Sequence, residues 1–171
     1  MNPTNLSKKS SGMLLFIILL LPLQLWAQSP IAAAIKQNRA QLHYPLSVER
    51  FYKQEGFRFM WVLKDTLKNS GVGCDANIGL CLQYGLNSAD YHPQELTYEV
   101  FHKVQAVKAI NNDKACFDVI LTDAIIILIN NLHYGKLNPD FPLSKVDTDD
   151  ITQFKGDKAL LNAQVQDRAG I

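Results

Sequence analysis

The amino-acid sequence predicts an all-α fold, compact around one buried central helix and carrying one short extended aromatic segment. Three observations support this prediction. An apolar helical stretch occupies residues 117–132, apolar residues recur at helical spacing on both sides of it, and residues 57–62 alternate with the period of a strand. If the first 27 of the 171 residues are set aside, the rest suffices for one small domain with its own core.

The central helix is expected within residues 115–139. Apolar side chains lie on nearly all its sides, so it must be buried. Asp118 and Asp123 interrupt an apolar run shorter than the roughly 20 residues that cross a bilayer, so we expect a core helix. Gly135 is expected to follow the helix in a left-handed conformation, and Pro139 to block its continuation. One face of the helix is expected to carry Phe117, Leu121, Ala124, Leu128 and Leu132.

Proline and glycine delimit the elements before the central helix. Ser29 and Pro30 predict the N-cap and the first residue of a helix. This helix is expected to end before Pro45, because the residue before a proline avoids the α region. A second short helix is expected from Ser47 to Gly56.

The segment 57–62 alternates aromatic residues with other residue types. This period of two predicts an extended segment that places Phe57, Phe59 and Trp61 on the core. The alternative is an aromatic platform that binds sugars or bases.

Further helices are expected on both sides of the central one. A helix over residues 74–85 should end at Gly85, followed by a polar connection over residues 87–92. Another helix should start at Pro93. Asp157 is placed to cap a last helix.

Residues 1–27 have the layout of a secretory signal peptide. Two lysines precede an unbroken apolar run over residues 13–21, and Ala27 offers a cleavage site. The alternative is an uncleaved membrane anchor, because Leu25 is not the small residue expected before the cleavage site. We expect an exported protein of the periplasm or cell envelope.

The charge and the cysteine spacing argue against a nucleic-acid binder and against a metal site. With 17 basic and 16 acidic residues, the chain lacks the basic surplus of a nucleic-acid binder. Cys74 and Cys81 would lie about 10.5 Å apart on one helix, beyond the reach of a disulfide, so we expect core thiols there. A bridge from Cys116 to either remains open. No CxxC and no Cys/His ligand spacing occurs, so no metal or cofactor is predicted.

No set of catalytic residues assembles from the sequence. A cysteine nucleophile needs a nearby base, and none of the histidines shares a local signature with a cysteine. Asp118 and Asp123 are five residues apart and point in different directions, which argues against a shared acid–base site. Asp123 is expected to be buried against an arginine or a helix N-terminus. The four histidines are His43, His92, His102 and His133.

Three stretches, in chain order, point to one family: FYKQEGFRFMWV at residues 51–62, YGLNSADYH at 84–92, and LTDAIIILINNLHYGKLNP at 121–139. Together they resemble the N-terminal scaffold domain of the large periplasmic L,D-transpeptidases, which cross-link peptidoglycan stem peptides. The resemblance covers roughly residues 31–160. The matching motif residues, to which it gives a structural role, are Trp61, Gly85, Leu86, Asp90, Tyr91, Thr122, Asp123, Tyr134, Gly135 and Pro139.

The resemblance implies a helical support that packs against a separate catalytic domain, an acyltransferase acting through a cysteine. The family's nucleophile lies far downstream in an S-H-G-C-x-R motif, and this sequence contains no His-Gly-Cys. Residues 28–171 are therefore expected to be a non-catalytic, C-terminally incomplete scaffold domain. The implied partners are the catalytic domain and peptidoglycan, without nucleic acid and without a membrane after signal cleavage.

Two other hypotheses stay open. The chain could be a stand-alone exported module that binds peptidoglycan or a protein through its aromatic segment. It could also be a cysteine enzyme in its own right, which would require thiol-dependent turnover.

Overall fold

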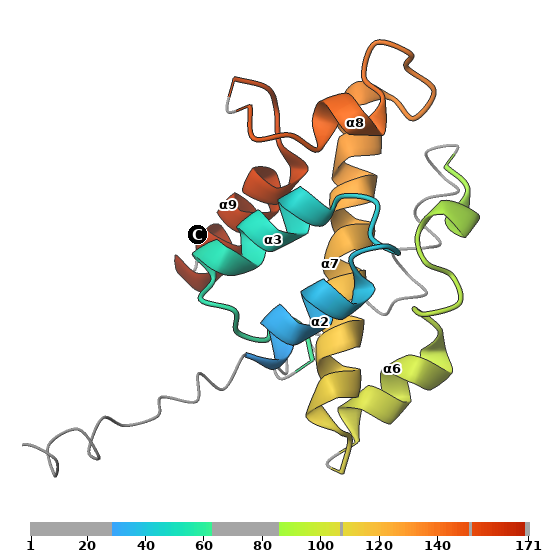
Figure 1. Cartoon of the computed structure of the whole chain (residues 1–171), viewed down its shortest axis with the longest axis vertical. Helices are drawn as coiled ribbons and strands as arrows, with labels where there is room; N and C mark the ends of the chain where they lie inside the picture. The colour runs from blue at the N-terminus through green and yellow to red at the C-terminus, as the bar shows by residue number, and fades with distance from the viewer. Residues whose placement is uncertain (1–28, 63–85, 107, 151, 170–171) are drawn as a thin grey trace, which may run out of the picture.

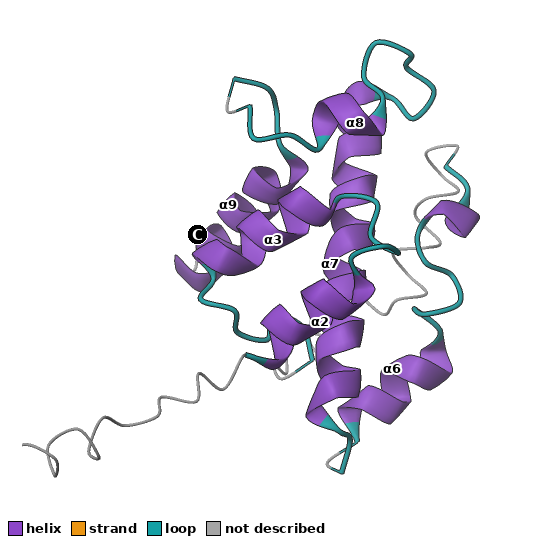
Figure 2. Ribbon diagram, viewed as in Figure 1, coloured by secondary structure: helices purple, strands orange, loops and turns teal. Residues whose placement is uncertain are grey.

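The computed structural model describes residues 29–62, 86–106, 108–150 and 152–169. Figures 1 and 2 show that these residues form a body of helices and loops, with no strand among them. The all-α prediction is therefore confirmed. The elements are α2 (Pro30–Asn38), α3 (Pro45–Gln54), the 3₁₀ helix η1 (Ser88–Asp90), α6 (Tyr98–Gln105), α7 (Asn111–Tyr134), α8 (Leu143–Val146) and α9 (Gly156–Ala169).

Helix α7 is the central element, as predicted. Helices α2, α3, α6 and α9 all pack against it, and α8 lies near its C-terminal end (Figure 1). Residues 117–124 are buried without interruption over more than two turns, so this part of α7 is enclosed on every side. Gly135 follows the helix with φ +83°, in the predicted left-handed region, and its N–H donates to the Asn131 carbonyl.

Helix α7 is longer and more apolar than predicted, so the prediction that it could not cross a membrane was wrong on these two grounds. The helix has 24 residues, and its length and composition would allow it to span a bilayer. However, 67% of its most apolar window is buried inside the fold. The burial, rather than the length, marks α7 as a core helix.

The expected apolar stripe on α7 is only partly buried. Phe117, Leu121 and Ala124 are buried, but Leu128 is half-buried and Leu132 is 50% exposed. Near this end of the helix, the start of α9 contacts the opposite face, where the Gly156 N–H donates to Asn130. At this end of α7, the buried face is therefore the one that carries the polar Asn130, and the face with Leu128 and Leu132 is more exposed.

The boundaries of α2 and α3 differ from the prediction. Pro30 is the first residue of α2 as expected, but the Ser29 hydroxyl donates to the Phe57 carbonyl at 2.7 Å instead of capping the helix. Pro45 starts α3 rather than ending the preceding helix, which closes at Asn38. Gly56, with φ +64°, turns the chain after α3 as predicted.

Residues 57–62 were predicted to be extended with the aromatic rings on the core. Instead this segment is a loop in which Met60 and Val62 are buried and the three aromatic residues are only partly buried. The reason is that successive backbone N–H groups curl around one buried carboxylate, that of Asp118.

The connection before α6 was predicted to be polar, with a helix starting at Pro93. Residues 88–90 form η1, and Tyr91 and His92 are buried. Helix α6 starts later, after Thr97, whose hydroxyl accepts the Val100 N–H at 3.2 Å. The helix expected over residues 74–85 and the N-terminal segment lie outside the described residues.

Candidate functional site: two buried aspartates and the adjacent pocket

Asp118 organises residues 60–62 from the middle of α7. Its carboxylate accepts the backbone N–H groups of Met60, Trp61 and Val62 at 2.8–3.0 Å. The Tyr52 hydroxyl lies 2.6 Å from the same carboxylate. We call this set the Asp118 network, and it ties α3 and the loop after it to α7.

Thr122, one turn further along α7, completes the Asp118 network. Its hydroxyl oxygen lies 2.7 Å from the Tyr52 hydroxyl and accepts the indole N–H of Trp61 at 2.9 Å. Asp118, Thr122 and Tyr52 are fully buried. The polar groups of this part of the core thus satisfy one another, as buried polar groups must.

Asp123 binds the start of α3 and the loop before α6. Its carboxylate accepts the backbone N–H groups of His43 and Tyr44, both at 2.9 Å. The His92 Nε2 lies 2.7 Å from Oδ2, and the His43 Nδ1 lies 3.6 Å from the same oxygen. We call this set the Asp123 network. The predicted helix N-terminus is thus present in part, because Tyr44 is the N-cap of α3, but the two imidazoles were not foreseen.

The two carboxyl groups differ in their electrostatics. Burial raises the pKa of Asp118, and its hydroxyl and backbone N–H donors offset this only in part. Burial also acts to raise the pKa of Asp123, but hydrogen bonds from His43, His92 and the backbone outweigh it, so that pKa is lowered. In turn, the nearby Asp123 carboxylate raises the pKa of His43.

His43, His92 and Asp123 also deserve consideration as metal ligands, since one ligand atom of each lies within 4.8 Å of the others. The contacts inside the cluster favour a different role. The 2.7 Å between His92 Nε2 and Asp123 Oδ2 is a hydrogen-bond distance, and both Asp123 oxygens already accept backbone N–H groups. Hydrogen bonding therefore accounts for the arrangement.

A third charged cluster joins α3 to α9. Arg50 donates from Nε to Asp157 at 2.7 Å and from Nη2 at 3.1 Å, in the two-pronged geometry typical of arginine and carboxylate. Asp147 accepts the N–H groups of Leu46 and Ser47 at the start of α3. Asp157 was predicted to cap the last helix, but it lies inside the first turn of α9, and its carboxylate pairs with Arg50.

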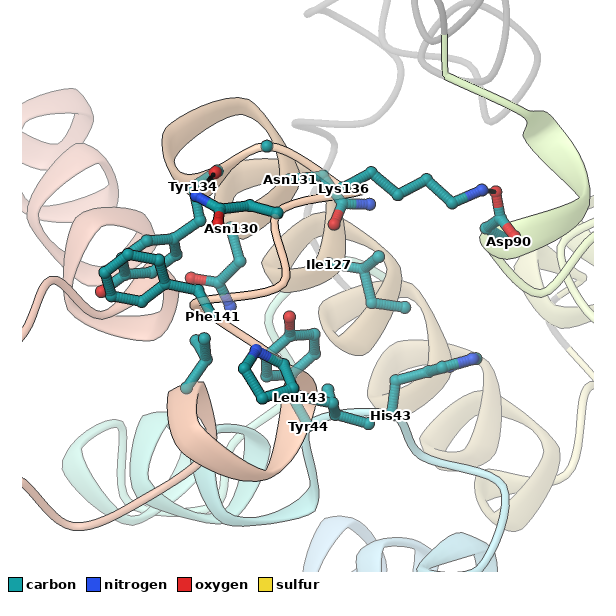
Figure 3. A pocket seen from close by; sticks show the side chains of 14 residues that line it. His43, Tyr44, Asp90, Ile127, Asn130, Asn131, Tyr134, Lys136, Phe141 and Leu143 are labelled. Atoms are coloured by element: carbon teal, nitrogen blue, oxygen red, sulfur yellow. Dashed lines mark hydrogen bonds and ion pairs between the residues drawn. The ribbon is translucent and has the colours of Figure 1, made fainter.

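A pocket of about 210 Å³ lies beside the Asp123 network, at the C-terminal end of α7 (Figure 3). Its wall includes Tyr134 and Phe141, whose rings stack with centroids 4.5 Å apart. Lys136 and Asp90 form an ion pair at its edge. Asn130 lies at its buried side and is only 2% exposed.

Most of the motif residues take part in these contacts. Trp61 and Thr122 belong to the Asp118 network, and Asp123 forms its own. The Tyr91 hydroxyl accepts an N–H from Asn131. The others are Leu86, which is buried, Asp90, Tyr134 and Gly135, which line the pocket, Pro139, which is exposed, and Gly85, which lies outside the described residues.

The cysteines and the remaining histidines stand apart from these networks. Cys116 is a free thiol whose sulfur accepts an N–H from Asn38 at 3.4 Å. It borders a second pocket, which no histidine of the described part of the chain lines. His133 stacks on Phe154 with centroids 3.7 Å apart. Cys74 and Cys81 lie outside the described residues.

Sequence reasoning missed Tyr52, His43 and Asn130 as polar members of the site. His92 was read as part of a polar connection, yet it is buried and has φ +53°, a positive value that is uncommon outside glycine. The available signal was the presence of Asp118 and Asp123 inside an apolar helix. Each buried carboxylate requires several donors, and those donors had to come from distant segments.

A comparison with protein families gave one match: the model of the Scaffold domain covers residues 46–167. This range is more than half of the chain, so the chain belongs to this family. Searches of curated proteins and of solved structures gave no match. The matched range contains all of α7, most of α3 and α9, and both aspartates.

Proposed function

We propose that this member of the Scaffold domain family is the non-catalytic support of an exported L,D-transpeptidase that cross-links peptidoglycan. The observation that carries the proposal is the convergence of the three resembling stretches. Residues 51–62, 84–92 and 121–139 each contribute to the Asp118 or Asp123 network. The Asp118 and Asp123 carboxylates bind backbone N–H groups of distant segments in the core. This favours a structural role.

Exposed apolar residues support a partner at one end of the molecule. Leu132, Leu137 and Leu143 are 50%, 89% and 43% exposed, and they come from the end of α7, the loop after it and the start of α8 (Figure 1). Three large apolar side chains exposed on consecutive elements favour contact with another protein. In this proposal, the catalytic transpeptidase domain covers them.

The aromatic-platform alternative has less support. Phe57, Phe59 and Trp61 are partly buried and pack against the core, and Trp61 is engaged by Asp118 and Thr122. A platform for sugars or bases needs ring faces open to solvent. The geometry of this segment therefore favours a structural role.

Reading the genomic DNA beyond codon 171 tests the proposal. We expect the frame, or an adjacent gene, to encode an S-H-G-C-x-R motif. The corresponding protein should form cross-links, and Leu137→Ser together with Leu132→Ser should weaken its contact with the present chain. Gln41→Ala, at an exposed residue by the Cys116 pocket, is the matched control.

Two results would contradict the proposal. A locus without any such catalytic sequence would contradict the proposal and favour a stand-alone module. Thiol-dependent turnover by the isolated chain, lost when its three cysteines are changed to serine, would favour the cysteine enzyme.

A further inference from the structure

The pocket at the C-terminal end of α7 contains a buried donor without an acceptor. The Asn130 Oδ1 accepts the Gly156 N–H at 3.1 Å, which fixes the orientation of the amide. Its Nδ2 consequently faces the pocket, where it has no hydrogen-bond partner (Figure 3). A buried N–H that stays unpaired is costly, so an acceptor from outside the chain is expected there.

The Tyr44 hydroxyl supplies a second donor beside Asn130. The two side chains lie close enough for Asn130 to influence the pKa of Tyr44, but they form no hydrogen bond of ordinary geometry. Burial raises the pKa of Tyr44 to about 12, so the hydroxyl keeps its proton at neutral pH. The buried side of the pocket therefore offers two neutral donors.

An acceptor lies on the same helix, one residue further along. Asn131 donates through Nδ2 to the Tyr91 hydroxyl at 2.9 Å, and its carbonyl oxygen remains to accept from a ligand in the pocket. Asn130 and Asn131 thus offer one donor and one acceptor. A secondary amide, with its C=O and N–H, is complementary to this pair.

The surroundings favour a neutral ligand with a small apolar group. The pocket lies at the C-terminal end of α7, where the helix dipole disfavours anions, and Lys136 is already paired with Asp90. The apolar part of the lining consists of the stacked Tyr134 and Phe141 rings together with Leu143 and Val146. A volume of about 210 Å³ accommodates a small group but not a folded segment.

We propose that this pocket binds the acetamido group of an N-acetylated amino sugar. The sugar's carbonyl oxygen accepts from Asn130 Nδ2 and the Tyr44 hydroxyl, its N–H donates to Asn131, and its methyl group contacts the apolar lining. The inference deepens the proposed function, on which the source of the ligand rests, because the glycan strands of peptidoglycan are built from such sugars.

An NMR titration of the purified protein tests this inference. N-acetylglucosamine should shift the side-chain amide signals of Asn130 and Asn131 in a saturable way, with a Kd of about 1–10 mM, as expected for a small ligand. Glucosamine, which lacks the acetyl group, should leave them in place. Tyr44→Phe should weaken binding about fivefold, and Asn130→Asp, which keeps the acceptor for Gly156, should abolish it. Gln41→Ala should bind as the parent does.

Three results would overturn the inference. They are the absence of a saturable shift, an equal response to glucosamine, and a response to N-acetyl-alanine methylamide but not to the sugar, which would identify a peptide site. Failure here leaves the proposed function intact, because the DNA test does not involve the pocket. Conversely, a locus without the catalytic motif would remove the proposed function even if the sugar binds.

Discussion

Asp118 and Asp123 lie five residues apart on α7 and are both fully buried, yet their pKa values shift in opposite directions. Each accepts backbone N–H groups from a distant segment. The difference is in the remaining donors: Asp118 has a tyrosine hydroxyl, whereas Asp123 has two imidazoles. At Asp118 the hydroxyl and N–H donors do not fully offset burial, whereas at Asp123 the imidazoles and N–H groups together outweigh it, so only the Asp123 carboxyl has a lowered pKa.

The same comparison separates two structural tasks. The Asp118 network shapes one loop, since three of its donors are consecutive N–H groups. The Asp123 network joins two segments, the start of α3 and the loop carrying His92. Substitutions in the two networks should therefore differ both in size and in their dependence on pH.

Asp118→Ala should give the largest loss of stability. It leaves the backbone N–H groups of Met60, Trp61 and Val62 without their acceptor, although the Tyr52 hydroxyl keeps the Asp118 carbonyl, and we expect the free energy of unfolding to fall by more than about 3 kcal/mol. Urea denaturation measures the change. Asp113→Ala is the matched control on the same helix, because its pair with Lys103 is exposed and should contribute less than about 0.5 kcal/mol. A loss below 1 kcal/mol for Asp118→Ala would refute the role of the Asp118 network.

Substituting asparagine for Asp118 and for Asp123 should reduce stability by different amounts. Asp123→Asn removes the charge that the imidazoles favour, and we expect a loss of about 2 kcal/mol at pH 6. Asp118→Asn removes a charge that burial disfavours, so its loss should be smaller, about 1 kcal/mol. Thermal and urea unfolding of both variants give the order, and the reverse order would contradict the assigned difference.

Trp61→Phe tests one hydrogen bond of the Asp118 network. The change removes the indole N–H that donates to Thr122 at 2.9 Å and keeps most of the aromatic ring. We expect a loss of about 1 kcal/mol in urea denaturation. Phe59→Leu, in the same loop, is the comparison for lost aromatic area, and equal losses in the two variants would show that the hydrogen bond contributes nothing.

The smallest effect concerns pH and His43. Its pKa in the folded protein is raised above 6.5, so its contribution to stability is fully present below pH 6.5 and is lost as the pH rises through the folded value. Because the side chain is 47% exposed, the contribution should stay below about 1 kcal/mol. His43→Gln should flatten this decline in stability above pH 6.5, measured by urea unfolding from pH 5.5 to 8.5. An unchanged slope would contradict the proposed contribution of His43 to stability.

At acidic pH, Asp123 contributes to stability with the opposite dependence on pH. Its folded pKa lies below 3.8, so its contribution is present above pH 3.8 and is lost as the pH falls through the lowered value. The contributions of His43 and Asp123 are thus both fully present between about pH 4 and 6.5.

Local features of the fold could be predicted from the sequence. The apolar run marks α7, Gly56 and Gly135 mark turns with positive φ, and Pro30 marks the start of α2. Each of these depends on residues within a few positions of one another. Pro45 was misassigned because a proline at the start of one helix and a proline after the end of another look alike in sequence.

The site could not be predicted in the same way. Asp118 contacts residues 56–58 positions away, and Asp123 contacts residues 79 and 80 positions away. Hydrophobic periodicity carries no information on such pairs. The alternation in residues 57–62 was misleading for the same reason, because a distant carboxylate determines the path of that backbone.

A ¹³C NMR titration of the two side-chain carboxyl groups in one sample tests the central claim most directly. The structure predicts that Asp118 titrates above 3.8 and Asp123 below it, and that His43→Gln raises the Asp123 value while leaving Asp118 in place. If Asp123 titrated at the same pH as Asp118 or at a higher pH, the claim that their different donors shift the two pKa values in opposite directions would be contradicted.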